Sequence, residues 1–163
     1  AALSMLAWSS TISPEATAFL LDLGVPAIKV SAFEWSRRAE LGIPPDVTTI
    51  CSVRPTALAE VEAAPHDANT IILYCPPGYP ASCGNLAAMR TLARYAPVTG
   101  FSDHSLCATN AVLAVALGMQ MLEVLLMLEP AAYTTLPLDV AHSWTPSGMA
   151  GLVEAVRHAE TSL

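Results

Sequence analysis

Charged side chains are scarce in this chain of 163 residues. They make up 13% of it, about half of the ~25% typical of a soluble globular domain. Basic residues are the rarest, with 7 Lys and Arg against 14 Asp and Glu, and Lys29 is the only lysine. Because a phosphate backbone is bound through several clustered basic side chains, we expect no nucleic-acid partner.

Long apolar runs are also missing, although hydrophobic residues make up 53% of the chain. No run reaches the ~18 residues of a membrane span. The longest candidate, residues 111–128, is interrupted by Gly118, Gln120 and Glu123, and we expect it to form a helix followed by a buried strand. No basic segment precedes the first apolar stretch, as a signal peptide would require. We therefore expect a cytoplasmic protein without a membrane span.

The cysteines lack the C-x-x-C spacing of zinc and redox motifs. The four are Cys51, Cys75, Cys83 and Cys107. Three lie in or beside apolar, strand-like segments, which indicates buried free thiols in a reducing compartment. The sequence starts without Met, directly in apolar residues. We take residues 1–163 as one domain that is an excerpt or a mature piece of a longer chain.

Short apolar segments alternate with segments of helical spacing. Strands are expected at 27–30, 47–51, 70–74, 98–101 and 119–127, after an apolar run at 3–8. Helices are expected at 14–23, 56–64, 85–95, 109–117 and 147–158, with Ser13 and Ser147 as N-caps. Strands that are apolar throughout and alternate with helices indicate a parallel sheet covered by helices. About six such units fit either an open doubly wound sheet or a barrel.

Polar residues gather where the predicted strands end, and parallel strands bring such ends to one edge. Ser102, Asp103 and His104 form the densest cluster; they indicate either a site that binds metal or moves protons, or a helix cap beside a surface histidine. Lys29 ends a strand and either meets an anion or extends into solvent.

Four further polar residues each have a functional and a purely structural interpretation. Glu34 either pairs with Lys29, acts on a substrate hydroxyl or is a solvated loop acid. Tyr79 lines a pocket or packs its proline-rich loop, and Asp139 is in a loop where most carboxylates are solvated. Glu123 interrupts a very apolar strand, so it must face a polar cavity or be paired, unless the segment is a helix.

The ordered set of these segments resembles the N-acetylneuraminate (sialic acid) synthase family. The segments are Ser10-Thr11, residues 23–30, Tyr74-Cys75 with Tyr79-Pro80, residues 100–105, residues 114–118, Leu122-Glu123, and Asp139 with Ser143 and Pro146. Each motif alone is modest, but their order and spacing run through nearly the whole chain. The resemblance implies the C-terminal two-thirds of a TIM-barrel catalytic domain, a partial (β/α)8 barrel.

The resemblance also implies a reaction, the condensation of phosphoenolpyruvate with N-acetylmannosamine or a related amino sugar, with a divalent metal such as manganese or magnesium. Lys29, Thr11, Ser52 and Ser102 would hold phosphoenolpyruvate. His104 would be a metal ligand and a catalytic residue. Glu34 would be a second catalytic residue, near the reacting carbons or bound water. Tyr79 and Asp139 would contact the sugar.

Several positions depart from the family pattern. Leu125 stands where the pattern has a second metal-binding histidine, Val53-Arg54 replaces Thr-Gly, and Ala32 and Pro77 replace other polar or small residues. The first two strands and the antifreeze-like domain, which supplies an arginine to the sugar site, are outside this sequence.

Three alternatives follow from these departures. The chain is part of an active synthase, a catalytically degenerate synthase-like domain kept for binding or assembly, or an unrelated aldolase-type barrel. The open barrel edges are expected to be covered by another copy or a partner.

Overall fold

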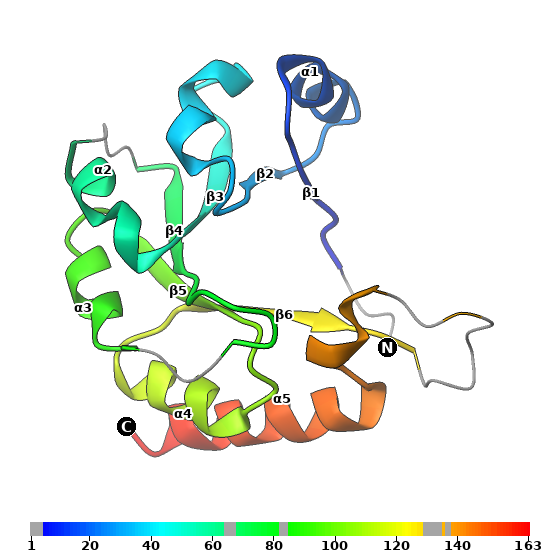
Figure 1. Cartoon of the computed structure of the whole chain (residues 1–163), viewed down its shortest axis with the longest axis vertical. Helices are drawn as coiled ribbons and strands as arrows, with labels where there is room; N and C mark the ends of the chain where they lie inside the picture. The colour runs from blue at the N-terminus through cyan, green and yellow to red at the C-terminus, as the bar shows by residue number, and fades with distance from the viewer. Residues whose placement is uncertain (1–4, 64–67, 82–84, 129–134, 136–137) are drawn as a thin grey trace.

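The computed structural model describes residues 5–63, 68–81, 85–128, 135 and 138–163. Its seven parallel strands follow one another in chain order through a single curled sheet (Figure 1). The strands are β1 (Ser9–Ser10), β2 (Ala27–Val30), β3 (Thr48–Val53), β4 (Thr70–Tyr74), β5 (Val98–Asp103), β6 (Met121–Leu126) and β7 (Ser143–Trp144).

Helices lie between the strands, around the outside of the curve (Figure 1). The α-helices are α1 (Pro14–Asp22), α2 (Leu58–Ala63), α3 (Ala88–Leu92), α4 (Ala108–Ala116) and α5 (Pro146–Thr161). Short 3-10 segments are η1 (Trp35–Leu41), η2 (Pro55–Ala57) and η4 (Leu138–His142). No described helix is long and apolar enough to cross a membrane.

The strand order distinguishes the two architectures that the sequence left open. A doubly wound sheet reverses its strand order at a switch point, whereas a barrel keeps chain order. Here the order runs without reversal from β1 to β7, so the chain forms part of a TIM-type α/β barrel, as the resemblance predicted. The residues before β1 that the structure describes, 5–8, are not a strand; β1 begins only after that apolar run.

The helix caps show one correct and one wrong prediction. Ser13 caps α1 as expected, because its hydroxyl accepts a hydrogen bond from the Ala16 N–H at 3.2 Å. Ser147 was predicted to cap the last helix, but Thr145 does so by accepting from the Gly148 N–H at 3.2 Å. The reason is Pro146, which takes the first helical position and leaves the cap to the residue before it.

Side chains alternate between the two faces of the strands and give each face a different chemistry. Val30, Val53, Tyr74 and Phe101 belong to the main buried cluster, which also contains helical residues such as Met89. Each large apolar side chain buried there contributes roughly 1.5–3 kcal/mol. The intervening residues face the concave side of the sheet, where a small apolar cluster of Ala27, Ile50 and Leu73 lies below polar strand ends.

Gly100 in β5 generates a prediction about stability. A Cβ at this position would overlap the Met121 carbonyl oxygen of β6 and lie 2.7 Å from Leu73 Cδ2. Gly100→Ala should therefore lower the free energy of unfolding by about 1–3 kcal/mol or more, measured by urea denaturation. Gly151→Ala in α5 is the matched control, because its Cβ would meet nothing within 4 Å, and it should stabilise the helix by up to ~1 kcal/mol. Equal stability of the Gly100 variant and the wild type would contradict the close strand approach.

Candidate functional site

A cavity of about 150 Å³ lies among the carboxyl ends of the strands. It brings together five of the residues that the sequence predicted as site residues: Lys29, Ser52, Tyr79, Ser102 and His104. They come from β2, β3 and β5 and from the loops after β4 and β5. The convergence follows from the parallel sheet, in which every strand delivers its last residues to the same edge.

Lys29 is the central cation of this cavity. It is 8% exposed, so it does not extend into solvent as one alternative had it. Its Nζ donates a hydrogen bond to Ser52 Oγ at 2.8 Å and lies 3.2 Å from Glu123 Oε2. The partner of Lys29 is therefore Glu123 in β6, and the suggested pairing with Glu34 is wrong.

Glu123, Ser102 and His104 form a connected polar chain. The Ser102 hydroxyl donates to Glu123 Oε1 at 2.6 Å and lies 3.2 Å from His104 Nε2. A hydroxyl has one hydrogen to give, so if both contacts are hydrogen bonds, Nε2 must carry the proton and donate to Ser102. His104 Nδ1 is then a proton acceptor, and it is buried without a hydrogen-bond partner in the described part of the chain.

The protonation of His104 is set mainly by its surroundings. Burial lowers the pKa of His104 from its ordinary value of 6.5, while the neighbouring Glu123 carboxylate acts in the opposite direction. The imidazole is therefore predominantly neutral at pH 7. A neutral ring with an open Nδ1 lone pair can take up a proton or bind a cation.

Two rings of the cavity wall, Tyr79 and His104, contact a third ring, His142, and the three together are called the rim. The ring centroids of Tyr79 lie 4.6 Å from His104 and 5.2 Å from His142, and the two histidines are 5.7 Å apart. His142 Nε2 is also 3.2 Å from Asp139 Oδ1. Asp139 therefore lies near the rim through His142, with a mostly exposed carboxylate, and it does not line the cavity.

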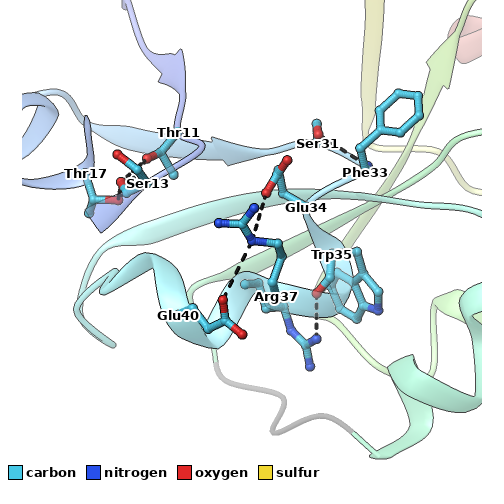
Figure 2. A network of polar contacts seen from close by, with 10 residues as sticks. Thr11, Ser13, Thr17, Ser31, Phe33, Glu34, Trp35, Arg37 and Glu40 are labelled. Carbon is cyan, nitrogen blue, oxygen red and sulfur yellow. Dashed lines mark hydrogen bonds and ion pairs between the residues drawn. The ribbon is translucent and has the colours of Figure 1, made fainter. Parts of the chain in front are cut away.

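Thr11 and Glu34 are the two predicted site residues that local partners hold elsewhere (Figure 2). Thr11 is fully buried, and its hydroxyl lies 3.0 Å from the Ser13 carbonyl oxygen and 2.9 Å from Thr17 Oγ1. Glu34 forms an ion pair with Arg37, with 3.4 Å between Oε2 and Nε. Neither residue lines the cavity.

The structure adds Glu123, Cys75 and Phe33 to the cavity wall. Glu123 had a sequence signal, since a carboxylate in an apolar strand needs a polar cavity or a partner, and it has both. Cys75 is a buried free thiol, as predicted, and burial raises its pKa. Asp103, between Ser102 and His104, accepts from the Ser105 N–H at 2.8 Å and thus stabilises the turn, while its two neighbours face the cavity.

The described residues do not fit a metal site built from protein ligands. Within the described ranges, no three His, Cys, Asp or Glu side chains gather closely enough to hold an ion. Leu125 follows Glu123 by two residues in β6 and so shares its face of the strand, but a leucine donates nothing to a metal. A cation beside His104 would take most of its ligands from substrate and water.

The half-buried, neutral His104 predicts a pH dependence of stability. The unfolded state binds a proton on this ring more readily than the folded state, so stability should fall as the pH drops below about 6.5 and level off below the folded-state pKa. His104→Gln should flatten this dependence, whereas His158→Gln, an exposed change in α5, should not. Urea midpoints at about pH 7.5 and 5.5 measure it, and an unchanged slope in His104→Gln would contradict the assignment.

Solved structures with the same fold include a sialic acid synthetase and a spore coat polysaccharide biosynthesis protein. The N-acetylneuraminic acid (sialic acid) synthetase of Leptospira borgpetersenii serovar Hardjo-bovis, in complex with citrate, superimposes with a TM-score of 0.80 at 23% identity, over 97% of this chain and 58% of that one. The spore coat polysaccharide biosynthesis protein spsE of Bacillus subtilis gives a TM-score of 0.77 at 22% identity, over 95% of this chain and 46% of that one. The chain thus spans about half the length of these structures.

Sequence comparison gives a second, independent result. No curated protein sequence gives a significant match. A family model, by contrast, matches residues 1–163. Because that match extends over the entire sequence, the chain belongs to the NeuB family.

Proposed function

We propose that this chain is the substrate-binding part of a synthase barrel that condenses phosphoenolpyruvate with N-acetylmannosamine or a related amino sugar. The observation that carries the proposal is the buried ammonium group of Lys29, held by Ser52 and Glu123 at the carboxyl ends of parallel strands. Membership of the NeuB family supports it, as does the likeness to a solved sialic acid synthetase.

The donors in the cavity suit an anionic substrate. Lys29 has three N–H donors, and Ser52 and Glu123 occupy two of them. Ser52 accepts from Lys29, so its own hydroxyl hydrogen remains available to a ligand oxygen. Lys29 and Ser52 can therefore bind a phosphate or carboxylate together and fix its orientation. Fixed orientation of two substrates is itself a large part of catalysis for a bond-forming reaction.

His104 and the rim would act on the second substrate. The buried, unpaired Nδ1 of His104 is the described group best suited to move a proton within the site. Tyr79 and, through His142, Asp139 would contact the sugar. Glu34 can join the reaction only if its carboxylate turns away from Arg37. A divalent metal would polarise the sugar aldehyde, but no step can be assigned to one with the donors present.

A second candidate function is a degenerate synthase-like domain that binds a ligand or assembles with another chain. Leu125 favours it, because this apolar side chain shares the strand face of Glu123. Exposed apolar residues beside the edge strands also favour assembly, such as Met5 ahead of β1 and Leu126 at the end of β6. Unpaired strand edges readily pair with other chains.

Lys29→Met tests the ligand class. Removing the ammonium while keeping most of the side-chain volume should weaken phosphoenolpyruvate binding roughly 10- to 100-fold, because a charge-assisted hydrogen bond contributes about 1.5–3 kcal/mol. Isothermal titration calorimetry measures the effect, with Arg94→Met, an exposed change after α3, as control. Ser52→Ala should give a smaller loss in the same direction. Wild-type affinity in both cavity variants would rule out this site for phosphoenolpyruvate.

Leu125→His tests the metal and the activity together. The 163-residue chain should show no tight manganese site by calorimetry and no measurable consumption of phosphoenolpyruvate with N-acetylmannosamine and manganese. In Leu125→His, the added imidazole should strengthen manganese binding. Robust turnover by the unchanged chain would refute the expected impairment. Tight manganese binding without the substitution would instead point to His142 or Asp139 as ligands.

A further inference from the structure

Arg54 is not in the wall of the Lys29 cavity, but it contacts Phe33, which is. It follows β3 directly, and its backbone is still extended, with φ −86° and ψ 155°. Side chains two residues apart in an extended strand share a face, so Arg54 is on the same side as Ser52, the residue that holds Lys29.

The guanidinium of Arg54 stacks on an aromatic ring. Arg54 Cζ lies 4.1 Å from the centroid of the Phe33 ring. Phe33 is itself part of the cavity wall and is 63% exposed. In Figure 2 the Phe33 ring extends away from the Glu34–Arg37 pair. The charges of that pair therefore lie on another side of the ring. A guanidinium stacked on a ring face keeps its N–H donors in the guanidinium plane, free at the edges for an oxyanion.

The charges around the cavity leave Arg54 uncompensated. Within the wall, Lys29 is offset by Glu123, and His104 is predominantly neutral at pH 7. Arg54 is half-buried, and its guanidinium group forms no ion pair or hydrogen bond with any residue of the described ranges. The charge of Arg54 nevertheless acts on Tyr79. Burial raises the pKa of Tyr79, and the positive charge of Arg54 opposes this rise.

Space is also available beside Arg54. A second cavity of about 290 Å³ lies on its other side, with Leu58, Asn85 and Thr91 in its wall. Arg54 thus lies in the wall of the larger cavity and contacts Phe33 of the smaller one, so it can receive a group that reaches from one toward the other. An unpaired, pre-oriented guanidinium next to a paired lysine is typical of a site for a multiply charged oxyanion.

We infer that Arg54 is a second anion-binding residue of this site and holds a phosphate group at its rim, next to the part of the ligand bound at Lys29. The assignment rests on the proposed function only in taking a phosphorylated substrate as the natural ligand. Phosphate is the chemistry that matches the guanidinium, because its oxygens accept two parallel N–H bonds and its charge exceeds that of a carboxylate.

Titration of inorganic phosphate, followed by NMR of backbone amides, tests this inference in the protein as it stands. Wild type should bind phosphate, and Arg54→Gln should weaken binding about tenfold or more. Arg54→Lys keeps the positive charge but loses the two parallel N–H donors of the guanidinium, so it should lose part of the phosphate affinity. Arg90→Gln, an exposed change in α3, should have none of these effects. Unchanged phosphate affinity in Arg54→Gln, or no phosphate binding by wild type, would overturn the inference.

Phosphoenolpyruvate and pyruvate, titrated in parallel, separate this inference from the proposed function. Arg54→Gln should weaken the binding of phosphoenolpyruvate. Pyruvate has a carboxylate but no phosphate, so its affinity should stay within about twofold of the wild-type value. Phosphoenolpyruvate binding that depends on Lys29 but not on Arg54 would leave the proposed function intact and refute the role of Arg54. Phosphate binding that depends on Arg54 without any binding of phosphoenolpyruvate would support the role of Arg54 and refute the proposed function.

Discussion

The ion pair between Lys29 and Glu123 is the constraint on which the rest of the structure depends. Lys29 lies in β2 and Glu123 in β6, four steps apart in the sheet order. Neighbouring strands are spaced by ~4.8 Å, so a flat sheet would separate these strands by about 19 Å. The observed N–O distance of 3.2 Å is possible only because the sheet curls, and the same curvature places Ser52, Ser102 and His104 around one cavity.

The sequence predicted most of the sheet because its signals are local. Apolar runs such as 70–74 specify strands by themselves, and the polar residues that follow them lie at one edge in any parallel sheet. The choice between barrel and open sheet was not local, because it depends on curvature that no single segment encodes. The cap of α5 was misplaced for a simple reason, since Pro146 shifts the helix start by one residue.

The composition of the site was predictable only in part. Thr11 and Glu34 have the right residue types, but Thr17 and Arg37, close by in sequence, hold them outside the cavity. Such short-range competition is visible in the sequence only if every nearby partner is considered. The pairing of Glu123 and the contact of His142 with Tyr79 join distant segments, so only the folded chain reveals them.

The unequal burial of the ion pair has a consequence for ligand selection. Lys29 is almost enclosed, whereas the Glu123 side chain is 34% exposed. The carboxylate is in contact with water while the ammonium is not, so Glu123 neutralises a cation that solvent hardly reaches. A neutral ligand that displaced it would strand a buried cation, at a cost of several kcal/mol, whereas an anion substitutes for it charge for charge. If the site binds an anion as proposed, the closed pair would disfavour uncharged molecules on charge alone.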